Sequence, residues 1–150
     1  MLKERRTKHV EYRGVKLADL EAGVQVPDGS LLVPVGIEGS ELTYGIPETL
    51  DSTADYAALA RPVFSEAGRF DTMETSKTVV LEGGIEFETD MFIAADEALM
   101  LMGAPLTVKK DADGFAKFGA AGATDKVLAK VVVGPADHPE GLLALVGCFK

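Results

Sequence analysis

The segment 77–93, KTVVLEGGIEFETDMFI, limits the possible fold more than any other part of this sequence. Its first part is rich in β-branched residues, which favour a pleated, half-buried surface. Gly83 and Gly84 tolerate the positive φ angles of a two-residue turn, so we predict a hairpin there. The alternation that follows predicts a strand with one buried and one solvated face. Its apolar-face positions are Ile85, Phe87, Thr89, Met91 and Ile93, and its polar positions are Glu86, Glu88 and Asp90.

The rest of the chain must supply strands to cover this apolar face, because an isolated two-stranded ribbon is marginal in water. Short β-rich runs separated by turn residues predict an all-β fold, a small β-barrel or sandwich with hairpins. Residues 94–102 fit a buried strand or a helical turn, and the Gly-Ala-Pro that follows favours a strand. The other predicted strands cover residues 9–17, 30–35, 41–46, 106–108, 115–118, 127–133 and 142–149.

One short helix is expected near residues 51–60, followed by a loop over residues 62–76. Asp51 or Ser52 can cap the helix, and Pro62 disfavours helical geometry at the residue before it. A chain of 150 residues fits one domain and needs no disulfide or metal to hold its core. We therefore expect residues 17–150 to form a single β-rich domain, preceded by residues 1–16, a basic, extended N-terminal arm and first strand.

Charge is unevenly spread along the sequence. Residues 1–16 hold six Lys or Arg and two Glu, a net +4, whereas residues 17–150 hold nine Lys or Arg and 22 Asp or Glu, a net −13. Direct nucleic-acid binding by the acidic body is not expected, because the body would repel a phosphate backbone. The basic segment suits docking onto another protein surface, and a solvated terminal tail is the alternative.

Opposite charges in two segments indicate how copies of the chain could meet. If the basic arm lay on the acidic strand face of the next subunit, the contact would be head-to-tail, closing a ring or tiling a surface. We predict this interface for Lys3, Arg5, Arg6 and Lys8 on the arm and for Glu82, Glu86 and Glu88 on the strand.

The single cysteine, Cys148, excludes an internal disulfide and fits a reducing compartment. It lies in an apolar terminal strand, which favours a packed thiol over a reactive one. No apolar run reaches the roughly 18 residues of a membrane span. The first residues are too charged to contain the apolar centre of a signal peptide.

Motifs for metal or phosphate binding are weak. Residues 119–122, GAAG, lack the Lys-Ser/Thr of a phosphate-binding loop. One cysteine and two histidines, His9 and His138, cannot complete a Cys/His zinc site. Asp137, His138 and Glu140 lie together in a proline-rich loop, but neighbouring loop positions rarely converge on one ion, so a structural loop is favoured. We expect no cofactor and no metal.

Motifs for catalysis are equally weak. Residues 111–114, DADG, resemble the start of a calcium loop but lack its later acidic ligands, so turn chemistry explains them better. Glu86 and Glu88 could be drawn as a hydrolase pair, yet a solvated or interface-facing acidic stripe is the simpler interpretation. Two histidines offer few partners for a serine nucleophile. We predict no catalytic residues and expect that the chain is not an enzyme.

Two segments do resemble a known class of proteins. They are ARPVFSEAGRFDTMETSKTVVLEGGIEFETDMF and GAPLTVKKDADGFAKFGAAGATDKVLAKVVVGPADHPEGLLALV, which together lie within residues 60–146. They resemble small structural proteins of tailed-bacteriophage virions and are most similar to head decoration proteins, which stabilise capsids. The shared pattern is a strand that leads into a hairpin, followed by a spacer of small residues, a further strand and a long loop.

This resemblance implies an all-β protein that works in many copies, as trimers on the capsid surface, assembled in the host cytoplasm. Its partners would be the major capsid protein, at junctions between capsid subunits, and copies of itself. A tail-tube subunit or other ring-forming virion component is the nearest alternative, because such proteins are also all-β and similar in length. A small ligand-binding β-barrel or enzyme is a third hypothesis from a different class.

Overall fold

The computed structural model describes residues 2–18, 26–50, 57–60 and 77–149, with backbone pairing alone at residues 4–14, 77–82 and 148. The regular structure of these parts is almost entirely β, which confirms the predicted all-β class. The elements are β1 (Leu2–Leu17), β2 (Leu31–Glu38), β3 (Glu41–Gly45), β4 (Ala58–Ala60), β5 (Lys77–Thr89), the 3-10 helix η1 (Ala94–Leu99), β6 (Pro105–Lys110), β7 (Ala116–Ala120), β8 (Ala129–Val133) and β9 (Leu143–Phe149).

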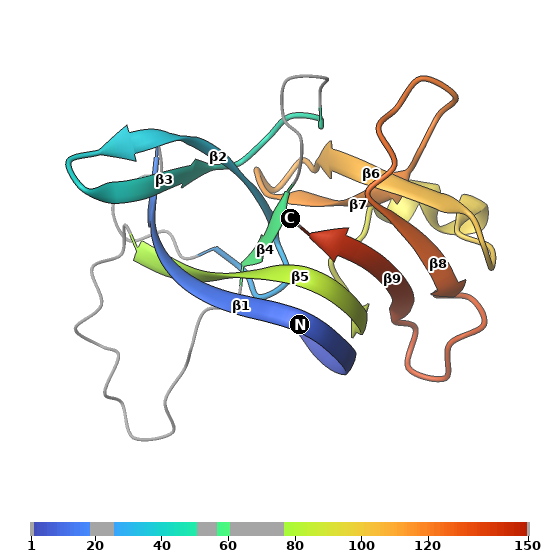
Figure 1. Ribbon diagram of the computed structural model, residues 1–150. Helices are drawn as coiled ribbons and strands as arrows, with labels where there is room; N and C mark the ends of the chain where they lie inside the picture. Colours follow the sequence, from blue (N-terminus) through green and yellow to red (C-terminus); the bar gives the residue numbers. More distant parts are fainter. Residues whose placement is uncertain (1, 19–25, 51–56, 61–76, 150) are drawn as a thin grey trace.

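The described strands form one continuous sheet in the order β1-β3-β2-β4-β5-β9-β8-β6-β7 (Figure 1). One edge of β5 pairs with β1 along its length, and the other edge pairs first with β4 and then with β9. Because β1 also pairs with β3, the strands β1, β3, β2, β4 and β5 form a closed ring of pairings. The remaining strands curl into a second half, where Phe92, just past β5, bridges to Phe118 of β7. β5 therefore belongs to both halves.

Two clusters of buried apolar side chains lie on opposite faces of β2 and β4. Successive side chains of a strand point to opposite faces. Leu31 accordingly belongs to the larger cluster and Leu32 to the smaller one. In β4, Leu59 packs in the larger cluster, whereas Ala58 and Ala60 pack in the smaller one. These strands separate the two cores, which explains why their sequences are continuous apolar runs without alternation.

Three aromatic rings fill the centre of the larger cluster. Phe87 of β5, Phe118 of β7 and Phe149 of β9 are completely buried. Their centroids lie 5.6–6.0 Å apart in tilted or edge-to-face arrangements, the geometry that aromatic quadrupoles favour. The central strand is thereby fixed to both β7 and β9.

The predicted hairpin at Gly83-Gly84 is wrong, because β5 runs through both glycines without a turn. β1 pairs with β5 on both sides of this point, so the chain has no room to reverse. The β1–β5 register shifts between Lys8 and Glu11, opposite the glycines, and Gly83 has a φ of 132°. A glycine inside a strand often marks such an irregularity, and the sequence signal resembles that of a turn.

The N-terminal strand begins at Leu2, so residues 2–8, which we expected to form an arm, belong to β1. The strands expected over residues 30–35, 41–46, 106–108, 115–118, 127–133 and 142–149 correspond to β2, β3, β6, β7, β8 and β9.

The expected helix near 51–60 is not seen in the described part of that range. Residues 58–60 form β4, which is buried on both faces, and burial of this kind overrides local propensity. Residues 51–56, like the predicted loop over 62–76, lie outside the described residues. The strand favoured over residues 94–102 is also wrong, because 94–99 form η1.

Candidate functional site

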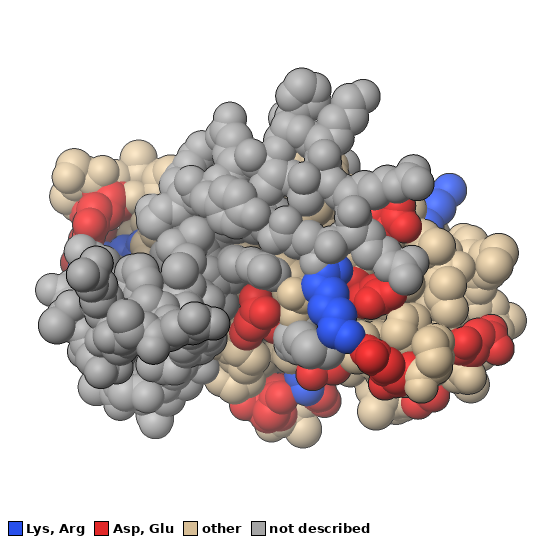
Figure 2. All heavy atoms as spheres, turned by 90° about the horizontal axis from the view of Figure 1, so that it is seen from below, with Lys and Arg blue, Asp and Glu red and all other residues tan. Residues whose placement is uncertain are grey.

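The oppositely charged segments predicted to meet between copies lie on paired strands of one chain. β1 carries the basic residues and runs antiparallel to β5, which carries the acidic ones. Figure 2 shows one face of the molecule, where acidic side chains predominate over basic ones on the described surface. An interface between copies at these residues stays a prediction. The register pairs Lys3 with Glu88, Arg6 with Glu86, Lys8 with Gly84 and Glu11 with Glu82, while Arg5 lies at a shift between Glu4 and Arg6.

Glu88 is buried, although the strand alternation predicted a solvated carboxylate. The loop between β8 and β9 covers it, and His138 Nε2 lies 3.1 Å from Glu88 Oε1. Both side chains are nearly enclosed, with exposed fractions of 7% for His138 and 10% for Glu88. The other ring nitrogen, Nδ1, accepts a hydrogen bond of 3.1 Å from the Glu140 backbone N–H. A backbone N–H can only donate, so Nδ1 is the acceptor and carries no hydrogen. The hydrogen of the ring is therefore on Nε2, which donates to the Glu88 carboxylate.

Glu140 extends this contact to the N-terminal strand. Its carboxylate forms an ion pair with the Lys3 ammonium. The hydrogen bond between them raises the pKa of Lys3 and lowers the pKa of Glu140. The Leu2 N–H donates to Asp28 Oδ2 at 3.0 Å. We call Lys3, Glu88, His138 and Glu140 the N-terminal clasp, because together they join the start of β1 to β5 and to the β8–β9 loop.

Within the clasp, His138 has a structural role, because its ring joins Glu88 of β5 to Glu140 of the β8–β9 loop. Among the described residues, the ring makes hydrogen bonds only to Glu88 and Glu140, so both nitrogens have structural partners. The residues Asp137, His138 and Glu140, considered above as a metal set, do not converge. In the described part of the chain, no three His, Cys, Asp or Glu side chains gather closely enough to hold a metal ion.

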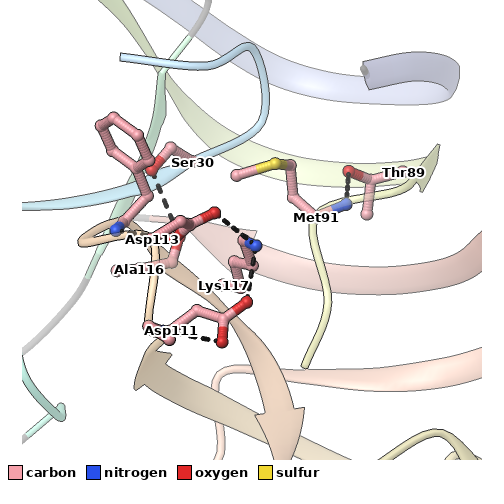
Figure 3. Close-up of polar contacts among 9 residues, drawn as sticks. Ser30, Thr89, Met91, Asp111, Asp113, Ala116 and Lys117 are labelled. Atoms are coloured by element: carbon pink, nitrogen blue, oxygen red, sulfur yellow. Dashed lines mark hydrogen bonds and ion pairs between the residues drawn. The ribbon is translucent and has the colours of Figure 1, made fainter. Parts of the chain in front are cut away.

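The 111–114 turn uses its carboxylates internally, as Figure 3 shows. Asp111 Oδ2 and Asp113 Oδ2 each lie 2.6 Å from Lys117 Nζ. The hydrogen bond from Lys117 holds the pKa of Asp111 below its ordinary value. Burial alone lowers the pKa of Lys117, but its bonds to the two aspartates outweigh burial and raise it. Gly114 has the positive φ, 88°, that the predicted turn requires.

A second feature, which sequence reasoning missed, is a group of exposed apolar side chains at the end of η1 and in the loop that follows it. Leu99, Leu101 and Met102 are 62%, 64% and 81% exposed. We call these three residues the apolar loop. The run LMLM was expected to be a buried strand or a helical turn, but only Met100 is buried, at 1% exposure. Composition alone gave no signal that one of the four would anchor the other three.

Several contacts fix the apolar loop in place. Asp96 Oδ2 of η1 accepts hydrogen bonds from Lys109 Nζ at 2.7 Å and from the Ala120 N–H at 2.9 Å. The Gly103 N–H donates to the Val131 carbonyl at 2.8 Å. The Met100 carbonyl lies so close to Gly134 that a Cβ there would be 2.1 Å from it. The loop is therefore held from β6, β7 and β8.

A third feature is the β2–β3 hairpin. Leu31, Leu32 and Val33 are buried, whereas the rest of β2 is exposed, including Val35 at 56% and Ile37 at 71%. The outer half of the hairpin thus extends beyond the core (Figure 1). The strand itself was predicted from the sequence, but its exposure was not.

None of the described helices is long and apolar enough to cross a membrane. Comparisons with protein-family models, curated proteins and solved structures find no match for this chain.

Proposed function

We propose that this chain is a bacteriophage virion structural protein that decorates and stabilises the capsid by binding at junctions between major capsid subunits. The observation that carries the proposal is the apolar loop, in which three large side chains are held outward. Scattered exposed apolar residues are ordinary, but a contiguous exposed group is typical of a protein-binding surface. Leu99, Leu101 and Met102 place three large exposed apolar side chains within four residues of sequence.

The fixed geometry of the apolar loop strengthens this interpretation. Binding costs conformational entropy when a surface must be ordered, and a surface already held in place avoids much of that cost. The Met100 side chain is buried in the middle of the loop, and Asp96 and Gly103 are hydrogen-bonded to neighbouring strands. A preorganised apolar group of this kind suits the anchor residues that carry most of the energy of an interface.

The identity of the partner rests on the resemblance of residues 60–146 to head decoration proteins. That resemblance favours assembly as trimers on the outside of the shell. The all-β fold is consistent with it. The acidic body, net −13 over residues 17–150, favours a protein partner over nucleic acid.

Binding to empty capsids of the same phage, assembled without this chain, tests the proposal. We expect the wild-type protein to co-sediment with capsids and to add density at subunit junctions in electron microscopy. Leu101→Asp should weaken binding at least about tenfold, because it places a charge in the buried centre of the contact. Val127→Asp, at a residue 50% exposed outside the apolar loop, is the matched control. Absence of capsid binding by the wild type would refute the proposal.

A ring-forming tail component is the second candidate, and the β2–β3 hairpin favours it. A hairpin that extends beyond its own core can reach a neighbouring subunit in a ring. Electron microscopy of the purified protein alone separates the two candidates. Stacked rings would support the tail component, whereas capsid-dependent binding without stacking would support decoration.

A further inference from the structure

One row of side chains crosses the outer face of the sheet where β8, β9 and β5 lie side by side (Figure 1). Val146 of β9 pairs in register with Lys130 of β8 on one side and with Glu86 of β5 on the other. Paired residues of neighbouring strands point to the same face. The residues next to them, such as Leu145 and Phe87, belong to the larger core, so the row points away from it. We call Lys130, Val146 and Glu86 the outer row.

The outer row reaches solvent and its charges have no partner within the described chain. Lys130 is exposed, Val146 is 46% exposed and Glu86 is half-buried. In the described part of the chain, the side chains of Lys130 and Glu86 make no hydrogen bond or ion pair. Five other lysines do form ion pairs with carboxylates, namely Lys3, Lys16, Lys109, Lys110 and Lys117. The row therefore presents a cation, an apolar side chain and an anion in that order.

This order makes the row complementary to a second copy of itself. Sheets that pack face to face commonly keep their strands within about 30° of each other. A two-fold axis that runs along β9, between two such sheets, reverses the order of the strands in the facing copy. Lys130 of each copy then faces Glu86 of the other, and Val146 faces Val146. An axis at right angles to the strands would instead place Lys130 over Lys130, so the charges select one arrangement.

We propose that the outer rows of two copies bind each other around this two-fold axis. Two Lys130–Glu86 ion pairs would flank a contact between the two Val146 side chains, and both copies would use the same surface. Charge complementarity identifies the occupant, because the row matches its own reversed copy. The inference goes beyond the proposed function, since the apolar loop is not part of the row and the contact forms without a capsid.

The contact is small. Glu88, the next residue of β5 on this face, lies beneath the β8–β9 loop, which limits the open surface to the row and to Pro105, the partner of Lys130 in β6. An interface of this size lies at the weak end of protein–protein contacts. Its ion pairs are accessible to salt, so low ionic strength should favour association.

Sedimentation velocity on the full chain in low-salt buffer, from micromolar to about millimolar concentration, tests the contact. We expect a monomer–dimer equilibrium in the wild type. Lys130→Glu should raise the dissociation constant at least about tenfold, because symmetry turns both attractive pairs into pairs of like charge. Val146→Asp should have a similar effect, because it places two carboxylates together at the axis. Lys110→Glu, an exposed position with the same change in net charge, is the control and should leave the constant nearly unchanged.

Mixing two variants makes the test specific to a two-fold contact. Glu86→Lys alone should also be monomeric, because two cations would face each other. An equimolar mixture of Lys130→Glu and Glu86→Lys chains should form dimers, since every charge then faces its opposite, and the double variant should associate with itself again. A mixture of Lys110→Glu and Glu86→Lys chains has the same net charges and is the matched control.

Three results would overturn the inference. They are a wild type that stays monomeric over this range, wild-type oligomers that Lys130→Glu and Val146→Asp leave unchanged, and a Lys130→Glu with Glu86→Lys mixture that associates no better than the control mixture. No capsid takes part in these measurements. Failure of the two-fold contact is therefore distinct from failure of capsid binding, which Leu101→Asp tests.

Discussion

At the scale of single residues, His138 matters because it makes burial of the Glu88 carboxylate tolerable. Removal of the ring would leave this acceptor without its imidazole donor at a site where water has little access. We expect His138→Ala to destabilise the protein by about 1–3 kcal/mol, the usual effect of removing a partner from a buried polar group. Asp137→Ala, in the same loop but exposed, should change stability by less than about 0.5 kcal/mol. Urea unfolding at pH 7.5 measures both, and equal effects would contradict the role assigned to His138.

The Asp111–Lys117 contact predicts a pH dependence at the same scale. Because the pKa of Asp111 is lowered, its contribution to stability is present above the unfolded-state pKa of about 3.9 and is lost as the pH falls through the folded-state pKa. The pKa of Lys117 is raised, so the alkaline loss occurs only above about pH 10.4. Asp111→Asn should therefore lower the Tm at pH 7 but have little effect near pH 2. A Tm difference that is independent of pH would contradict the contact, and Asp137→Asn serves as control.

At the scale of elements, the support of the apolar loop can be tested at one glycine. A methyl group at Gly134 would lie 2.1 Å from the Met100 carbonyl, so the two segments must separate. We expect Gly134→Ala to cost about 1–3 kcal/mol, in the range of overpacking substitutions, and to weaken capsid binding by displacing the loop. Gly36→Ala is the matched control, because nothing lies within 4 Å of its added methyl. Chemical denaturation compares the two, and a neutral Gly134→Ala would show that the loop is not fixed by this contact.

The elements also show what the sequence could predict. Alternation correctly identified the apolar face of β5, because Ile85 and Phe87 are buried, and turn chemistry correctly placed the β6–β7 hairpin. The prediction of a turn at Gly83-Gly84 failed because a pair of glycines permits a turn without requiring one. Here β1 pairs with β5 on both sides of the two glycines, which keeps the strand extended. Burial of Glu88 depends on a loop more than 40 residues away in sequence, which local periodicity does not contain.

At the scale of the whole molecule, the candidate surfaces consist of apolar side chains that lie outside the two buried cores. The charged residues of β1 and β5 were visible in the sequence, but their pairing within one chain depends on the closed ring of strands. The apolar loop and the outer half of the β2–β3 hairpin were not predicted as surfaces, since Leu101 and Ile37 are residue types that usually lie in a core. Only the position of the two cores shows that these side chains lie outside them.

The same arrangement predicts that the two cores unfold together. β2 and β4 separate the two cores and contribute side chains to both, with Leu32 in the smaller cluster and Leu59 in the larger one. Neither core can open without exposing a face of these strands, so loss of one should destabilise the other. We expect Leu32→Ala and Leu59→Ala each to cost about 2–5 kcal/mol. Each should also shift one cooperative transition in calorimetry, with equal calorimetric and van't Hoff enthalpies. If Leu32→Ala instead split the transition and left a component at the wild-type Tm, the two cores would be energetically independent.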